Sequence, residues 1–274
     1  PGVAVFDVAA EKVTQIISMP APVSGVVLDE EKNILYAGSQ KDRDQIYVYD
    51  LKKSEAKENI STGYGVEELA ISNKTRLLFS ANKFTNDIAV FNLENQKEIS
   101  RIKVVREPVA LSVSPNEKLL AVANLLPVQS AMEKYISANV SLIDIKNKSV
   151  VKNVMLPNGS FALKDILFSN DGKYIYVSHL IGRFNVLTSQ IEKGWINTNA
   201  LSIIDVQTQE LYTTVLLDDI YKGAANPCGL EISEDDKQLF VAVSGTHELF
   251  VIDRDAMHSK IEKSKENSKI IRDY

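Results

Sequence analysis

Two histidines occupy matching places in neighbouring parts of a repetitive sequence, and polar residues surround both. His179 ends the stretch YIYVSH, and His247 lies in the turn GTHE. A pair of imidazoles with a carboxylate and a guanidinium nearby can bind an anionic ligand, hold a metal ion or transfer protons. The residues that complete this candidate binding set, with Gln190 and Asn199 close by, are Arg183, Glu192, Trp195, Asn197, Asn226 and Glu248.

The same residues also fit a purely structural role. Long loops need internal hydrogen bonds, and His, Asn and Arg side chains often supply them. Arg183 and Glu192 could equally form an ion pair that clamps a loop, and Trp195 could anchor it. Loop ordering, binding of a ligand or partner, and catalysis or metal binding therefore stay open. In the catalytic version His179 or His247 is the base and Arg183 stabilises a developing oxyanion.

A hexapeptide that recurs six times shows which elements must position these residues. The copies are VAVFDV, IYVYDL, IAVFNL, VSLIDI, LSIIDV and LFVIDR, at a period of about 42 residues with insertions. Each contains an acidic or amide marker in its fifth position, namely Asp7, Asp50, Asn92, Asp144, Asp205 and Asp253. Asp and Asn favour turns, so we expect each marker to accept hydrogen bonds from backbone amides in the turn that follows. Single markers in separate repeats cannot converge on one calcium ion, and we predict no metal site.

Short β-branched and aromatic segments surround each marker and predict strands rather than helices. Four antiparallel strands per repeat, named A to D from the axis outward, are typical of an all-β fold, the β-propeller. We predict complete blades at 22–62, 66–105, 107–157, 161–218 and 226–265. Residues 1–19 form a partial blade, the propeller spans 1–254, and 255–274 form a charged helix or linker in which His258 is solvated.

About five and a half blades predict part of a ring of six to eight. The chain begins at Pro1 without a methionine, and five and a half blades would leave open sheet edges. We therefore expect the intact protein to extend beyond one or both ends.

The long loops gather in one sector of the predicted propeller. Loops between strands B and C lie on the same face as loops between strands D and A, and binding residues concentrate on such loops. Insertions fall in the B-to-C loops at 125–139 and 180–200, and the equivalent turn of the next blade holds His247. We therefore expect a protein module or small ligand to bind at this B-to-C loop face, and both histidines to point toward it.

Composition excludes several classes of function. The balance of 31 basic against 36 acidic residues gives a net charge of −5, so nucleic acid is not an expected partner. The sequence has no apolar run long enough to cross a bilayer and no signal peptide. The single cysteine, Cys228, is expected to be a small buried residue. Motifs of the HExxH, GxSxG, GKS/T and GxGxxG types are absent.

The stretches YIYVSH and LFVAVSG resemble the YVTN-type propeller repeat of bacterial and archaeal periplasmic or surface proteins. Residues 176–253 are similar to a subgroup of bacterial exported propellers often fused to c-type cytochrome or di-haem peroxidase-like modules. The resemblance implies a periplasmic or cell-surface location and a haem in a fused module. This chain has no CxxCH motif, so we expect no cofactor within it.

These observations favour a non-catalytic binding or docking propeller from a larger exported bacterial protein, serving a cytochrome-type redox module. A lactonase-like hydrolase with a histidine-based site on the propeller rim is the alternative. A structural protein of a surface layer is a third interpretation, and it would have a flat rim.

Overall fold

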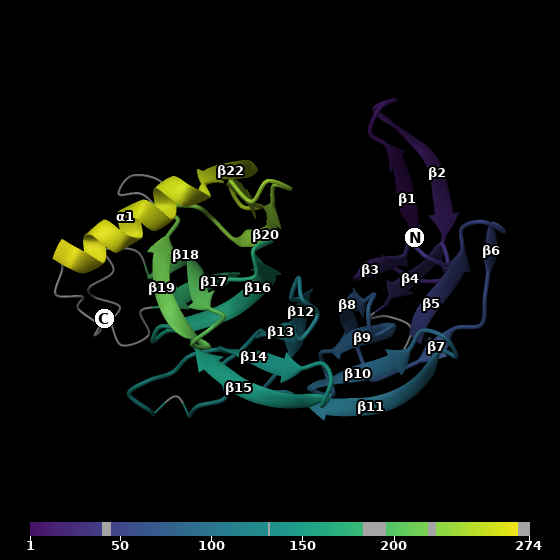
Figure 1. Ribbon diagram of the computed structural model, residues 1–274, viewed down its shortest axis with the longest axis horizontal. Helices are drawn as coiled ribbons and strands as arrows, with labels where there is room; N and C mark the ends of the chain where they lie inside the picture. The colour runs from purple at the N-terminus through teal and green to yellow at the C-terminus, as the bar shows by residue number, and fades with distance from the viewer. Residues whose placement is uncertain (40–44, 131, 183–195, 219–222, 268–274) are drawn as a thin grey trace. The chain divides into compact units, whose positions relative to one another are not determined.

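The computed structural model of the chain describes residues 1–39, 45–130, 132–182, 196–218 and 223–267 (Figure 1). These residues form twenty-two strands, β1 to β22, and one helix, α1. The chain divides within β12 into two compact units, Pro1–Leu111 and Ser112–Tyr274. No helix of the described part is long and apolar enough to cross a membrane.

The first unit contains three antiparallel sheets. A two-stranded sheet is followed by a five-stranded sheet, in which β6 and β7 both pair with β5, and by a four-stranded sheet. The strands in chain order are β1 (Gly2–Asp7) and β2 (Lys12–Ser18), β3 (Val26–Asp29), β4 (Ile34–Gly38), β5 (Gln45–Asp50), β6 (Glu55–Ala56) and β7 (Ile60–Ser61), then β8 (Val66–Ser72), β9 (Leu77–Asn82), β10 (Asp87–Asn92) and β11 (Lys97–Lys103).

The second unit contains two four-stranded sheets, a three-stranded sheet and the helix. The first sheet opens with β12, which spans the division. The elements are β12 (Pro108–Val113), β13 (Leu119–Asn124), β14 (Asn139–Asp144) and β15 (Ser149–Met155), then β16 (Ser160–Phe168), β17 (Tyr174–Gly182), β18 (Asn197–Asp205) and β19 (Glu210–Leu216), then β20 (Pro227–Ile232), β21 (Gln238–Val243), β22 (Glu248–Asp253) and α1 (Arg254–Asn267).

Apolar residues on facing sheets form the core within each unit. In the first unit Tyr36, Ile46 and Phe91 belong to one buried cluster shared by two sheets. In the second unit Leu201 and Val241 belong to a cluster that joins sheet β16–β19 to sheet β20–β22. One antiparallel sheet cannot bury both of its faces alone, so each sheet of the repeat depends on its neighbour.

The predicted turn role of the markers is confirmed. The carboxylate or amide oxygen of every marker accepts a hydrogen bond from the backbone N–H three residues later, at distances of 2.6 to 3.3 Å. For example, Thr208 N donates to Asp205 Oδ1 at 2.7 Å. In the first five repeats the fourth residue after the marker has a left-handed backbone, with φ between 50° and 57°. These residues are Glu11, Ser54, Gln96, Lys148 and Gln209.

The last repeat departs from the prediction of a fourth strand after Asp253. The sheet ends with its third strand, β22, and the chain turns directly into α1. Asp253 Oδ1 accepts the bond from Ala256 N at 2.8 Å, the contact that caps a helix at its first turn. Because this contact is shared by the hairpin turn and the helix start, the marker alone did not distinguish them.

Two further expectations about single residues are wrong. His258, expected in solvent, is half-buried against the second unit, because α1 packs on sheet β16–β19. Its ring centroid lies 4.4 Å from that of Tyr174. Cys228, expected to be buried, is exposed. It lies at the register shift between Pro227 and Gly229, where the strand is locally irregular.

Candidate functional site

His179 lies inside a sheet rather than at a loop mouth. The two strands around it are longer than predicted: β17 continues to Gly182 and β18 begins at Asn197, and His179 pairs with Ala200. The side chain is fully buried. Its Nδ1 lies 3.1 Å from the carbonyl oxygen of Leu180, and its Nε2 lies 2.7 Å from Ser202 Oγ. A carbonyl only accepts, so Nδ1 carries the proton and Nε2 accepts from Ser202.

The surroundings of His179 keep it neutral. Burial lowers the pKa of the imidazole to about 4, because the charged form loses its hydration. Ser202 in turn lies within hydrogen-bond distance of Thr214 Oγ1, 2.8 Å away on β19. The three side chains therefore form a polar chain across β17, β18 and β19, from the buried His179 and Ser202 to the half-buried Thr214.

The equivalent chain occurs in the preceding sheet, with different residues. Asn124 is the last residue of β13, and His179 occupies the matching position in β17, which then continues to Gly182. Asn124 donates to Ser141 Oγ at 3.0 Å. Ser141 donates to Asn153 Oδ1 at 2.7 Å on β15. Since Asn124 is placed by the same register and has the same kind of partners, we interpret His179 as a structural link between strands.

His247 has the opposite environment. It is exposed in the turn between β21 and β22, with φ of 56°. The hydrolase alternative requires both imidazoles in one open pocket, but the structure encloses His179 within its own sheet. Arg183, the oxyanion partner in that alternative, lies outside the described residues together with Glu192, Gln190 and Trp195.

The remaining predicted residues lie at the ends of strands in the second unit. Asn197 is exposed at the start of β18 and pairs with Gly182. Glu248 begins β22 and pairs with Val243. The described residues contain no group of three His, Cys, Asp or Glu side chains that could hold a metal ion.

Asn226 belongs to a polar network that the sequence analysis described only in part. Asn199 donates to Asp218 from both its backbone N, at 2.6 Å, and its Nδ2, at 2.8 Å. Asn226 N donates to Asn199 Oδ1 at 3.0 Å, and Asn226 Nδ2 donates to Ser244 Oγ at 2.6 Å. The network links β18 and the segment after β19 to the entry and exit of the next sheet.

Asp218 and Ser244 are the members that sequence reasoning missed. Asp218 also accepts a bond from Ala224 N at 2.6 Å, so it closes the connection between two sheets. An acidic residue directly after a fourth strand was the available signal. The network makes this rim a fixed polar surface.

A buried arginine attaches α1 to the unit. Arg254 donates through Nε to the Tyr176 hydroxyl at 2.8 Å and through Nη2 to Asp171 Oδ2 at 3.0 Å, and it pairs with the Asp236 carboxylate. The Tyr176 hydroxyl also lies 2.8 Å from His258 Nε2. Burial raises the pKa of Tyr176 to about 12, although Arg254 acts against this shift. Burial alone would raise the pKa of Asp171, but its hydrogen bonds, including the one from Arg254, lower it overall.

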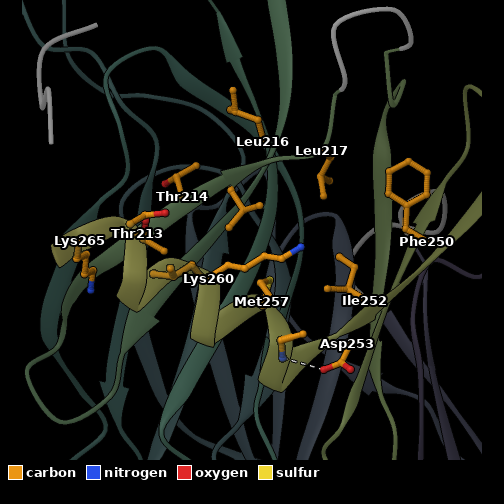
Figure 2. A pocket seen from close by; sticks show the side chains of 14 residues that line it. Thr213, Thr214, Leu216, Leu217, Phe250, Ile252, Asp253, Met257, Lys260 and Lys265 are labelled. Atoms are coloured by element: carbon orange, nitrogen blue, oxygen red, sulfur yellow. Dashed lines mark hydrogen bonds between the residues drawn. The ribbon is translucent and has the colours of Figure 1, made fainter. Parts of the chain in front are cut away.

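A groove of about 660 Å³ lies between β19, β22 and α1 (Figure 2). Its walls are largely aliphatic and aromatic, and Lys260 extends across it from the helix toward Leu217 and Ile252. The lining side chains include Leu216, Leu217, Phe250, Ile252, Met257 and Lys260.

Stacked antiparallel sheets, each built from one copy of a repeat of about 42 residues, define the class of the protein as a β-propeller. The predicted all-β propeller fold is therefore confirmed, and comparison with solved structures supports it. The solved hydrazine synthase of Kuenenia stuttgartiensis matches with a TM-score of 0.88 at 23% identity, over 99% of this chain and 76% of that one.

Two curated proteins are similar in sequence. The hydrazine synthase subunit beta of Kuenenia stuttgartiensis is 29% identical over 61% of this chain and 44% of its own length. Antigen Lp49 of Leptospira interrogans is 24% identical over 82% of this chain and 56% of its own length. The chain thus spans about half the length of the curated relatives it matches. No protein-family model matches it.

Proposed function

We propose that the chain is a non-catalytic docking propeller within a multi-subunit assembly. The observation that carries this proposal is its similarity to a protein named as the beta subunit of an enzyme, together with a fold match over nearly the whole chain. In such an assembly the propeller supplies a rigid surface, and the chemistry belongs to other parts. We further propose that the chain is part of a larger exported protein, that it lies in the periplasm or at the cell surface, and that a neighbouring module holds a haem. These parts of the proposal rest on the YVTN resemblance.

The B-to-C loop face is the proposed docking surface. The Asn199, Asp218 and Asn226 network supports this choice, because the buried Asn199 holds the half-buried Asp218 and the exposed Asn226 in one arrangement at that rim. A preformed surface loses little conformational entropy when a partner binds. The enclosed His179 gives the lactonase-like alternative no support.

The test uses the full-length protein, tagged and purified from its native host. We expect a native mass well above that of one chain in light scattering, with a second polypeptide in fixed stoichiometry. Asn197→Arg should weaken that complex, since Asn197 is exposed on the proposed face. Gln207→Arg is the matched control, because Gln207 is exposed in the turn at the other end of the same strand.

Two results would contradict the proposal. If the protein elutes from native extract as a single polypeptide, it is not part of a multi-subunit assembly and the docking function is contradicted. Equal loss of the complex in both variants would remove the B-to-C face from the proposal. An absorption spectrum of the purified complex tests the haem part, which requires a Soret band from the partner or fused module.

A further inference from the structure

Within the part of the chain that the structure describes, the third strand of the last sheet has one edge without a strand partner. Among the described residues, β22 pairs only with β21. In the preceding sheets the equivalent strands β10, β14 and β18 each pair with a fourth strand, and the register shifts after the same position. An open edge presents backbone N–H and C=O groups that can accept a further strand.

Side chains on β22 are exposed where their equivalents are covered. Counted back from the marker, Leu249 corresponds to Leu201, and Val251 corresponds to Ile203. Leu249 is 60% exposed and Val251 is 55% exposed, whereas both equivalents are fully buried. Leu201 and Ile203 belong to the buried cluster that sheet β20–β22 covers, so Leu249 and Val251 lie on the face of the last sheet that no further sheet covers among the described residues. A strand added at the edge of β22 would extend this apolar face beside Leu249.

Helix α1 leads the chain away from this edge instead of filling it. The contacts of Arg254 and His258 hold the helix against the preceding sheet, and the groove remains between the helix and β22. In Figure 2 the groove is bounded by Phe250 and Ile252 on one side and by Met257 and Lys260 on the other. The space beside β22 is thus shaped by two elements that are both fixed.

The fourth strands of the other sheets show what fits such an edge. Each carries an aliphatic residue in its sixth position, opposite the equivalent of Leu249, and these residues are Ile17, Ile102, Val154 and Val215. The first three are buried, while most of the other residues in their strands are exposed. A strand with one aliphatic residue at that point is therefore the occupant whose pattern matches.

We propose that the free edge of β22 and the adjoining groove bind an extended segment of a partner polypeptide, which adds to the sheet as a fourth strand. This inference rests on the proposed docking function and names the class of partner. Backbone hydrogen bonds supply general affinity in this mode of recognition, and alternate side chains supply selectivity. The segment places an aliphatic residue opposite Leu249. It places an acidic residue opposite Phe250, because no ion pair of Lys260 occurs within the described ranges and its amine extends into the groove.

The experiment measures fluorescence anisotropy of labelled peptides with the purified full chain. The probe has the sequence of residues 210–217, ELYTTVLL, with Thr214→Glu, since Thr214 stands opposite the equivalent of Phe250. We expect saturable binding, about two- to fivefold tighter than for the Thr214→Lys peptide. Lys260→Glu in the protein should reverse that preference. The matched control is Lys263→Glu on the same helix, which should leave the preference unchanged because Lys263 does not line the groove.

Backbone pairing is tested separately from side-chain contacts. Methylation of alternate backbone nitrogens in the peptide should abolish binding, because it removes the donors of the strand ladder. Three results would each overturn the inference. The methylated peptide could bind with equal affinity, no peptide could show saturable binding, or the chain could form a dimer with which the peptide does not compete. If the native assembly forms but no peptide binds, only this inference fails. If the peptide binds and the native protein is alone, the proposed function fails.

Discussion

Sheet β16–β19 and sheet β20–β22 derive from the same repeat and end differently. Both carry a marker aspartate that binds the backbone N–H three residues later, Asp205 in one and Asp253 in the other. After Asp205 the chain takes a left-handed residue, Gln209, and returns as a fourth strand. After Asp253 the corresponding residue, Met257, continues a helix. One local contact therefore permits two structures, and the residues that follow decide between them.

The two outcomes also distribute polar groups differently. The four-stranded sheet encloses a polar chain of His179, Ser202 and Thr214. The three-stranded sheet has Val243 at the place of His179 and instead depends on the Arg254 cluster at its outer end. Internal links between strands in one sheet are thus replaced in the other by a charged attachment of the helix, and each should contribute measurably to stability.

The largest effect is expected for Arg254→Ala. The change removes the cation that serves the partly exposed Asp171 and Asp236, and it takes one hydrogen-bond donor from the buried Tyr176 hydroxyl. Losing one partner of a buried ion pair costs about 3–5 kcal/mol in the free energy of unfolding, and the partial exposure of the two carboxylates places this variant near the lower end of that range. Urea denaturation followed by circular dichroism measures it. Arg106→Ala, at a surface pair with Glu107, is the control and should cost under about 1 kcal/mol. A similar small loss for both variants would show that α1 is not held by this cluster.

His179→Ala should have the next largest effect. It empties a buried position and removes one of the two side-chain partners of Ser202, and together these changes cost about 2–4 kcal/mol. His179→Asn should recover much of that loss, because Asn124 performs the equivalent role in the preceding sheet. The midpoint and slope of urea unfolding report both variants. If Asn proves no better than Ala, the two polar chains are not equivalent.

The pH dependence of stability should distinguish the same residue. The unfolded imidazole takes up its proton near its ordinary pKa of 6.5, whereas the buried ring resists until about 4. The unfolded state therefore binds more protons between these values, and stability falls as pH is lowered through this window. Wild-type protein should lose about 3 kcal/mol more than His179→Asn between pH 7 and pH 4. Parallel curves for the two proteins would contradict the buried neutral state.

Sequence reasoning reached the fold because its signals are local and repeated. Each marker, with the β-branched segment before it, specifies a strand and a turn independently of the rest of the chain. The position of His179 depended on how far β17 and β18 continue, and strand ends are set by pairing that a single sequence does not display. The contact of Asp218 with Asn199 spans 19 residues within one repeat, and an acidic residue after the fourth strand was the only signal for it in the sequence. A charged helix was one of the two predictions for 255–274, but a fourth strand was expected before it, because the marker satisfies both a turn and a helix cap.

The smallest effect is expected from removing the shared contact itself. Asp253→Ala removes the helix cap and should cost about 1 kcal/mol. Asp205→Ala removes the two hydrogen bonds from Thr208 in an exposed turn and should cost about 0.5 kcal/mol. The side-chain oxygen caps the helix in the first case, and the left-handed residue and the paired strands hold the turn in the second. Urea unfolding compares the two variants, and amide hydrogen exchange in α1 gives a local measurement. Faster exchange in α1 should follow only Asp253→Ala. If Asp205→Ala lowers the free energy of unfolding more than Asp253→Ala does, the turn depends on its marker more than the helix depends on its cap. The residues after the marker would then not decide between a turn and a helix.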